Sequence, residues 1–220
     1  MDHIAYIQSD FPDKFGIPRQ SGLVESLRSR VVFAPEYRNP DALRGIEGFS
    51  HLWLIWEFSE SVGKPWSPTV RPPRLGGNTR LGVFATRSPF RPNPIGLSCV
   101  RLVGVEHTKD GPTLVIAGAD LMDGTPIYDI KPYIPYADCQ PEALGGFTTN
   151  AADYLLTVDF PETELSKLPA DKRQTALDLL SHDPRPSYQK DPGRIYGMSF
   201  AGRNIRFRVE ENTLIVLEVL

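Results

Sequence analysis

Short runs of apolar, aromatic and β-branched residues, separated by glycine and proline, follow one another along most of this chain. The clearest run covers residues 51–58, His-Leu-Trp-Leu-Ile-Trp-Glu-Phe, a composition typical of a strand. Further strands are expected at residues 3–7, 81–85, 97–105, 114–117, 127–130 and 155–160. Short strands joined by stiff turns indicate a mainly β fold, either a barrel or a sandwich, and not an alternating βαβ array.

The pattern changes near residue 161. Residues 169–180 begin with a proline and place Ala176, Leu177 and Leu180 on one face, which predicts a helix. Three later strands are expected, the first two of them paired, at residues 195–200, 205–209 and 214–220. We therefore expect two domains, a mainly β domain at residues 1–160 and a small α+β domain at residues 161–220.

The composition narrows the class of protein. Proline is the outlier: its 21 positions among 220 residues are nearly twice the usual share of about 5 %. No apolar run is long enough to cross a membrane, and the N-terminus lacks the pattern of a signal peptide. The two cysteines form no CxxC motif and the four histidines form no metal-ligand cluster. These features predict a cytoplasmic protein with no membrane segment and no metal.

Charge is segregated along the chain, although the net charge is only −3. Residues 61–105 contain no Asp or Glu, yet they contain Lys64, Arg71, Arg74, Arg80, Arg87, Arg91 and Arg101. Inside this segment, residues 86–96 carry three prolines, which restrict the backbone and hold Arg87, Arg91 and Asn93 on a stiff loop. Such a loop is either a solvated turn or a binding site for a phosphate, a carboxylate or a base edge, and the lack of acidic residues favours the site.

A second polar segment covers residues 117–135 and contains Asp120, Asp123, Asp129, Lys131 and Tyr133. Taken alone it reads equally well as a solvated hairpin or as part of a site. The chain has no GxGxxG motif after a strand, no Walker loop and no GxSxG motif, so neither a Rossmann dinucleotide fold nor a serine hydrolase is indicated.

Several motifs together resemble those of the TsaA-like (YaeB) family, whose bacterial members are the TrmO methyltransferases. The resemblance rests on Pro18-Arg19-Gln20, Gly48 to Trp53, Arg71 to Arg74, Thr79 to Gly96, Asp120 to Pro126 and Asp129 to Tyr133. Residues 183–188, Asp-Pro-Arg-Pro-Ser-Tyr, look like the C-terminal domain of proteobacterial members. The resemblance implies a single-sheet β-barrel, unlike the Rossmann methyltransferases, that forms a homodimer.

The resemblance also implies an activity. The protein would transfer a methyl group from S-adenosylmethionine to N6 of threonylcarbamoyladenosine, next to the anticodon of threonine tRNAs. The implied cofactor-binding residues are Pro18, Arg19, Gln20, Ser59, Glu60, Arg87, Cys99, Asp120, Leu121, Met122 and Asp123. The pair Ser59-Glu60 stands where we expect relatives to carry His-Gln.

Roles in the reaction follow as hypotheses from the place of each residue in these motifs. Asp129 and Tyr133 are candidates for positioning N6 or accepting its proton. Candidate substrate and RNA contacts are Arg71, Arg74, Arg80, Arg91, Asn93, Lys131, Arg185, Lys190, Arg194, Arg203 and Arg206. For the basic residues of the tail, a solvated hairpin face is an equally good interpretation.

Two other functions fit the same residues. A non-catalytic RNA- or nucleotide-binding barrel would use the basic surface without S-adenosylmethionine. A phosphate-ester hydrolase is less favoured, because the sequence offers no metal cluster.

Overall fold

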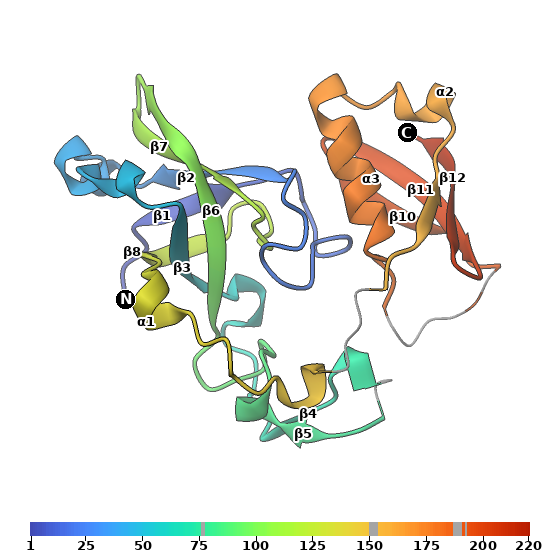
Figure 1. The fold of residues 1–220 in the computed structure, drawn as a ribbon, viewed down its shortest axis with the longest axis horizontal. Helices are drawn as coiled ribbons and strands as arrows, with labels where there is room; N and C mark the ends of the chain where they lie inside the picture. The colour runs from blue at the N-terminus through green and yellow to red at the C-terminus, as the bar shows by residue number, and fades with distance from the viewer. Residues whose placement is uncertain (76–77, 150–153, 187–190, 192) are drawn as a thin grey trace.

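The computed structural model describes residues 1–75, 78–149, 154–186, 191 and 193–220. Figure 1 shows two separate sheets side by side, with the loop that joins the first two strands running between them. A small hairpin of β4 (Thr69–Val70) and β5 (Leu81–Gly82) projects below the larger sheet. Within the described residues, no helix is long and apolar enough to cross a membrane.

The larger sheet has six antiparallel strands and closes on itself. Its order is β1 (Ala5–Gln8), β2 (Arg28–Phe33), β7 (Gly111–Ala117), β6 (Ile95–Thr108), β3 (His51–Glu57) and β8 (Pro126–Pro132). Closure comes from β1, which pairs with β2 on one side and with β8 on the other, where Ala5 lies opposite Ile127. The mainly β character expected from the sequence is confirmed.

Alternation along β3 explains why this segment forms a central strand. Leu52, Leu54 and Trp56 are buried inside the closed sheet, whereas the residues between them are only half-buried. A strand with every second side chain in the core fixes its own register, because a shift by one residue would expose all three. The strand expected at residues 51–58 is therefore confirmed, ending one residue earlier.

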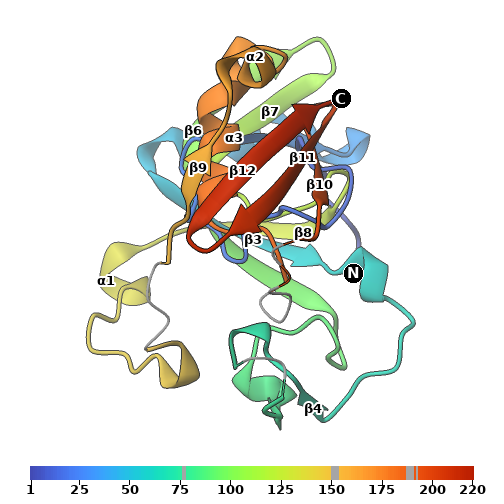
Figure 2. The same ribbon diagram turned by 90° about the vertical axis from the view of Figure 1, so that its right-hand side faces the viewer.

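The second sheet has the order β10 (Tyr196–Phe200), β11 (Arg203–Glu210), β12 (Thr213–Val219) and β9 (Thr157–Asp159). The pairing expected between the strands near residues 195–200 and 205–209 is confirmed by β10 and β11. The helix expected at residues 169–180 begins as a 3-10 turn, Ala170–Lys172, and continues as α3 (Arg173–Ser181). α3 lies beside this sheet and packs its buried residues on it (Figures 1 and 2).

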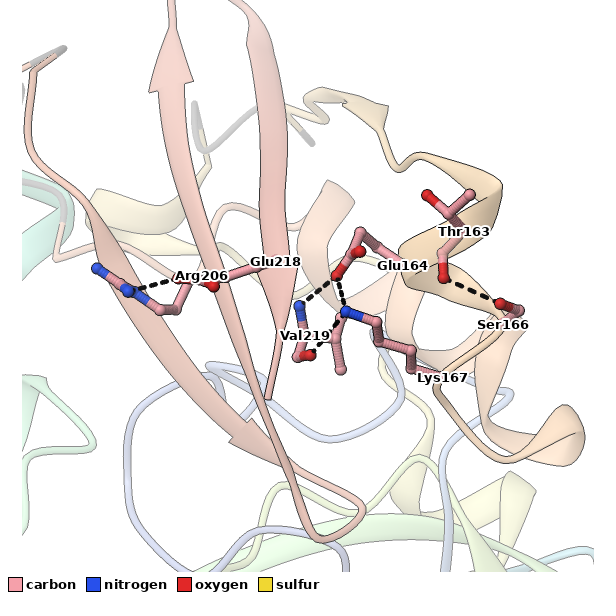
Figure 3. Close-up of polar contacts among 7 residues, drawn as sticks. All are labelled: Thr163, Glu164, Ser166, Lys167, Arg206, Glu218 and Val219. Atoms are coloured by element: carbon pink, nitrogen blue, oxygen red, sulfur yellow. Dashed lines mark hydrogen bonds and ion pairs between the residues drawn. The ribbon is translucent and has the colours of Figure 1, made fainter.

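Polar contacts fix the C-terminal end of β12 against the short helix α2 (Glu162–Leu165) (Figure 3). The Glu164 carboxylate accepts hydrogen bonds from the Lys167 ammonium at 2.8 Å and from the Val219 amide at 2.7 Å. These donors hold the pKa of Glu164 below its usual value. Ser166 Oγ donates to the Thr163 carbonyl on the same helix. The last residue of β12, Val219, is thus hydrogen-bonded to α2.

The strand expected at residues 81–85 is only partly present. Leu81 and Gly82 pair with β4, but Val83–Ala85 forms a 3-10 turn. The Val83 amide still donates across the pair to the carbonyl of Pro68, but Pro68 has no N–H to return. The Val83 carbonyl accepts from the Thr86 amide instead, so the ladder ends here. Sequence composition could not show this, because it depends on which residue of the partner segment lies opposite Val83.

The remaining short helices are Pro35–Tyr37, Pro40–Leu43, Ile46–Gly48, Ser59–Ser61, Pro73–Leu75, α1 (Pro135–Asp138) and Gly146–Thr148.

The long connection between β1 and β2, residues 9–27, belongs to both halves of the molecule. Its Phe11, Val24 and Leu27 are buried in the hydrophobic core that α3 and β10–β12 build. Gly16 lies so close to Met198 that a Cβ at this position would overlap the sulfur. The two cores are therefore joined by a segment that is remote in sequence from the second one.

Candidate functional site

A cavity of about 700 Å³ lies where four segments meet. They are the β1–β2 connection, the end of β3, the proline-rich loop that leads into β6, and the segment after β7. The lining residues are Pro18, Arg19, Gln20, Trp56, Phe58, Phe84, Thr86, Arg87, Arg91, Pro92, Asn93, Ile95, Gly96, Leu97 and Asp120. The two segments that charge and proline content singled out in the sequence thus meet at one site.

The proline-rich loop is held in shape by its own side chains. Arg91 Nη1 donates to the carbonyls of Thr86 at 3.1 Å and Ser88 at 3.3 Å. The Thr86 hydroxyl donates to the carbonyl of Val83 at 2.8 Å. Arg91 therefore holds the loop in shape with these hydrogen bonds, and it also lines the cavity.

Asp120 is the carboxylate of the cavity, and a chain of hydrogen bonds sets its position. Trp56 Nε1 donates to Ser98 Oγ at 3.0 Å, and Ser98 Oγ donates to Asp120 Oδ1 at 2.6 Å. Burial raises the pKa of Asp120, and the Ser98 hydrogen bond and the nearby charge of Arg87 partly oppose that rise. A negative group is thus held at the wall of a cavity that otherwise carries arginines.

Gly96 allows the wall to close. A Cβ at this position would overlap the indole ring of Trp56, which lies opposite it in the register of β3 and β6. Trp56 is 7 % exposed, so it is a core residue that also lines the cavity. Only glycine permits this close approach without moving the ring.

Six predicted cofactor residues do not line this cavity. Ser59 and Glu60 are exposed in a short helix after β3, where Glu60 pairs with Lys14 at 3.1 Å. Cys99 lies on β6 with its pKa raised, mainly by burial. The structure therefore separates these residues from Pro18, Arg19, Gln20, Arg87 and Asp120, which do line it.

The other three hold the segment after β7 in place. Leu121 is buried in the core of the closed sheet, and its carbonyl accepts a hydrogen bond from Ser9 Oγ at 3.1 Å. The carbonyl of Met122 accepts from Thr125 Oγ1 at 2.6 Å. Asp123 Oδ1 accepts from the Ser9 amide at 2.9 Å. Through Ser9, Leu121 and Asp123 fix the start of the β1–β2 connection that carries Arg19.

The candidate catalytic residues lie elsewhere on the sheet. The Asp129 carboxylate accepts from the Ile130 amide at 2.9 Å and pairs with Lys131 at 2.8 Å. Tyr133 follows β8 and lies against the rings of His51 and Trp53. Its pKa is raised by burial and by the nearby Cys139 thiol. None of Asp129, Lys131 and Tyr133 lines the cavity of the single chain.

The candidate RNA contacts are dispersed over both halves. Arg71, Arg80, Arg194 and Arg203 are exposed, and Arg80 Nε donates to Thr69 Oγ1 at 2.8 Å. Arg194 lies 5.4 Å from the ring centre of Tyr196, and Arg206 pairs with Glu218 (Figure 3). The side chain of Arg74 and the whole of Lys190 lie outside the described part of the chain. Arg185 differs from the rest, because its side chain is only 11 % exposed and pairs with Asp183.

Sequence reasoning missed the aromatic side of the cavity. Phe58 and Phe84 line it, and Phe84 is 75 % exposed. The available signal was Phe84, an aromatic residue two positions before the stiff loop begins at Thr86. It was missed because residues 81–85 were expected to form a strand. Among the described residues, no group of three or more His, Cys, Asp or Glu side chains could hold a metal ion.

Comparisons with known proteins point to one family for both halves of the chain. Residues 6–139 match the family model of the tRNA-methyltransferase O N-terminal domain, and residues 153–220 match that of the TrmO C-terminal domain. The chain is 44 % identical to the tRNA (adenine(37)-N6)-methyltransferase of Escherichia coli K12 over 96 % of this chain and 93 % of that protein. It is 41 % identical to a putative S-adenosylmethionine-dependent methyltransferase, RcsF, of Pseudomonas aeruginosa, over 98 % of this chain and 95 % of the relative.

The fold agrees as well. A crystal structure of TrmO from Pseudomonas aeruginosa superposes with a TM-score of 0.80 at 34 % identity, covering 99 % of this chain and 94 % of the other. Two domain models that together span nearly the whole sequence, and relatives of this identity and coverage, settle the family. The chain belongs to the tRNA-methyltransferase O family.

Proposed function

We propose that this protein transfers a methyl group from S-adenosylmethionine to N6 of threonylcarbamoyladenosine, beside the anticodon of threonine tRNAs. The observation that carries the proposal is the cavity in which Arg19, Gln20, Arg87 and Asp120 meet. The names of the bacterial relatives support the reaction class and the tRNA substrate. The modified base and the choice of threonine tRNAs come from the family resemblance.

The chemistry of the cavity fits this cofactor. S-adenosylmethionine carries an ammonium group, a carboxylate, a ribose diol and an adenine. Asp120 can accept from the ammonium, the diol or the adenine amino group, and Arg87 can donate to the carboxylate. Phe58 and Phe84 offer apolar surface for the adenine. The volume of about 700 Å³ lies in the range of about 300 to 1,000 Å³ usual for small-molecule sites.

When bound, the cofactor supplies an electrophilic methyl group on a sulfonium. Transfer of that methyl group to N6 would release the N6 proton, which Asp129 or Tyr133 would accept. The contribution of the protein is alignment, since the displacement is in line and an arrangement held in place removes most of its entropic cost. The self-braced loop of Arg87 and Arg91 suits that demand.

Asp129 and Tyr133 remain our candidates for positioning N6 or taking its proton. Because both lie outside the cavity of one chain, this role requires a homodimer in which the cavity of one protomer adjoins the β8 end of the other. The homodimer is therefore part of the proposal. A mixture of inactive Arg87→Ala and Asp129→Asn proteins should regain activity as subunits exchange. If Asp129→Asn alone turns over normally at saturating substrates, Asp129 is not the base.

Arginines at the surface supply the RNA-binding part of the proposal. Arg71 and Arg80 beside the β4–β5 hairpin, Arg194 just before β10, and Arg203 and Arg206 on β11 would contact tRNA phosphates, which makes affinity fall with salt. We place the boundary between the methyltransferase domain and the C-terminal domain near residue 160, and we propose a cytoplasmic location.

Titration calorimetry with S-adenosylmethionine tests the proposal. Wild-type protein should bind, and Arg87→Ala and Asp120→Ala should each weaken binding by about tenfold or more, the size of a lost charged hydrogen bond. Arg44→Ala is a matched control, because Arg44 is an exposed arginine that pairs only locally with Asp41. A folded wild-type protein that binds tRNA but no cofactor would support the RNA-binding barrel instead.

A further inference from the structure

We infer that Arg185 is a positioning residue of the cofactor site, which holds Arg19 in the cavity through the main chain of the turn at residues 183–185. The inference rests on the proposed function, because it takes the cavity as the cofactor site. It gives the C-terminal domain a part in cofactor binding, in addition to any contact with RNA.

The first support is the packing of the β1–β2 connection. Phe11, Val24 and Leu27 of this segment are buried among residues of α3 and β10–β12. Between them lie Pro18, Arg19 and Gln20, which line the cavity. The segment that reaches the cavity is therefore anchored at both ends in the core of the C-terminal domain.

Polar contacts join the same two partners. Asp10 forms an ion pair with Lys172, and its carbonyl accepts from the Ala201 amide at 3.1 Å. Ser26 donates to the Asp178 carboxylate, and its carbonyl accepts from Thr175 Oγ1 at 3.1 Å. These polar contacts lie near the two ends of the connection, and between them Phe15 and Ile17 pack against the same core.

Arg19 provides the contact at the centre. Its Nη2 donates to the carbonyl of Asp183 at 3.2 Å and to that of Arg185 at 2.9 Å. Two carbonyls two residues apart can converge on one nitrogen only if the turn between them is fixed. Here Asp183 adopts a left-handed backbone with φ of 49°, a conformation that is uncommon outside glycine and that aspartate tolerates better than most residues.

Arg185 holds that turn. Its Nε donates to Asp183 Oδ1 at 2.8 Å and its Nη2 to Asp183 Oδ2 at 2.9 Å, a two-pronged pair that only a guanidinium can form. The side chain is 11 % exposed, and the hydrogen bonds that it donates to the Asp183 carboxylate raise the pKa of Arg185. Two of the three guanidinium nitrogens are thus committed to the Asp183 carboxylate.

The effect can reach the rest of the cavity through Gln20. Its side-chain nitrogen donates to the carbonyl of Arg19, and its side-chain oxygen accepts from Arg87 Nη1. Arg87 in turn acts on the charge of Asp120. Hydrogen bonds and charge thus connect the turn at residues 183–185 with the carboxylate on the far wall.

The test compares Arg185→Ala and Arg185→Lys with wild type, measuring affinity for S-adenosylmethionine and, separately, for unmodified tRNA without cofactor. Both variants should lose about tenfold in cofactor affinity, because lysine cannot form the two-pronged pair, and both should bind tRNA as wild type does. Loss of tRNA affinity in Arg185→Ala with unchanged cofactor affinity, and partial rescue by lysine, would overturn the inference and make Arg185 an RNA contact.

A second readout does not depend on the cofactor. The Gly22 amide donates to the carbonyl of Gly118 at 2.8 Å, so its hydrogen exchange reports how firmly the connection is seated. Exchange at residues 18–23 should be faster in both Arg185 variants and unchanged in the Arg44→Ala control. Unchanged exchange in folded Arg185→Lys would also overturn the inference. If wild-type protein binds no cofactor, the proposed function fails, yet this exchange experiment still decides whether Arg185 positions the segment.

A double-mutant cycle separates the two arginines. Arg19→Ala and Arg185→Ala should lower cofactor affinity by amounts that do not add. Once the Arg19 side chain is gone, Arg185 no longer has a side chain to position in the cavity, so its loss costs little more. Additive losses would show that Arg185 acts independently of Arg19 and would contradict the inference.

Discussion

The side-chain oxygen of Gln20 accepts a hydrogen bond from Arg87, which lies 67 residues further along the chain. Gln20 belongs to the β1–β2 connection and Arg87 to the proline-rich loop, so this one contact joins the two walls of the cavity. Hydrogen bonds hold each wall in place. Arg19 of the connection donates to carbonyls of the C-terminal domain, and Arg91 donates to a carbonyl of its own proline-rich loop. The cavity is thus assembled from one wall that its own loop holds and one that depends on the C-terminal domain.

Replacing Asp120 by Asn should stabilise the protein at neutral pH while weakening cofactor binding. The pKa of Asp120 is raised in the folded state, mainly by burial, so the folded protein binds this proton more tightly than the unfolded chain does. Wild-type stability therefore falls as pH rises from the usual pKa of an aspartate through the raised value, and the lost stability is not regained above it.

Thermal melts of wild type and Asp120→Asn across this pH range check the sign. The difference in favour of the variant should be small in acid and grow toward neutral pH. Cofactor affinity should fall about tenfold at neutral pH, since a charged acceptor is replaced by a neutral one. A variant that is less stable than wild type at neutral pH would contradict the role given to burial.

Replacing Gly96 by Ala should destabilise the closed sheet by about 1–3 kcal/mol, because the new methyl group would overlap the Trp56 ring and force it aside. Gly104→Ala on the same strand is the matched control, since a Cβ there meets nothing within 4 Å. Urea denaturation monitored by tryptophan fluorescence measures both. Equal stability of the two variants would show that the approach of Gly96 to Trp56 is not tight.

Replacing Phe84 by Ala should weaken ligand binding without changing stability. Phe84 lines the cavity yet is 75 % exposed, so it contributes little to the core and offers a free ring face. Loss of a stacking partner costs about 1–3 kcal/mol for a base. Phe90→Ala is the control, because Phe90 lies on the same loop, is also exposed, and does not line the cavity. Measured affinities that are equal for the two variants would argue against stacking at Phe84.

Replacing Arg203 by Ala should lower the salt dependence of tRNA binding. Arg203 is exposed at the start of β11, so a phosphate contact there would release counterions. The slope of log affinity against log salt should decrease in magnitude by about one unit. Filter binding over a salt series measures it, with Arg44→Ala as the control for the loss of an exposed positive charge. An unchanged slope would favour the solvated hairpin face that the sequence left open.

The sequence alone determined several of the strands and the family motifs. The buried alternation of residues 51–57 fixes β3, because only one register buries Leu52, Leu54 and Trp56. Prolines near Arg87 fix a stiff loop, because their rings restrict the backbone locally. Both effects act between neighbours along the chain, so they can be read without knowing the fold. The strand expected at residues 81–85 is too long for the opposite reason, since its end depends on Pro68, which lies opposite Val83 on the partner segment and has no N–H to donate.

Tertiary structure decided which residues share the cavity. Asp120 lines it, whereas Asp123, only three positions later, accepts from the Ser9 amide instead. From the sequence, Arg185 is expected to be a surface charge. In the structure its side chain pairs with Asp183, and the carbonyl of Arg185 accepts a hydrogen bond from Arg19. Such roles depend on contacts across more than 160 residues of chain, and local propensity carries no information about contacts of that range.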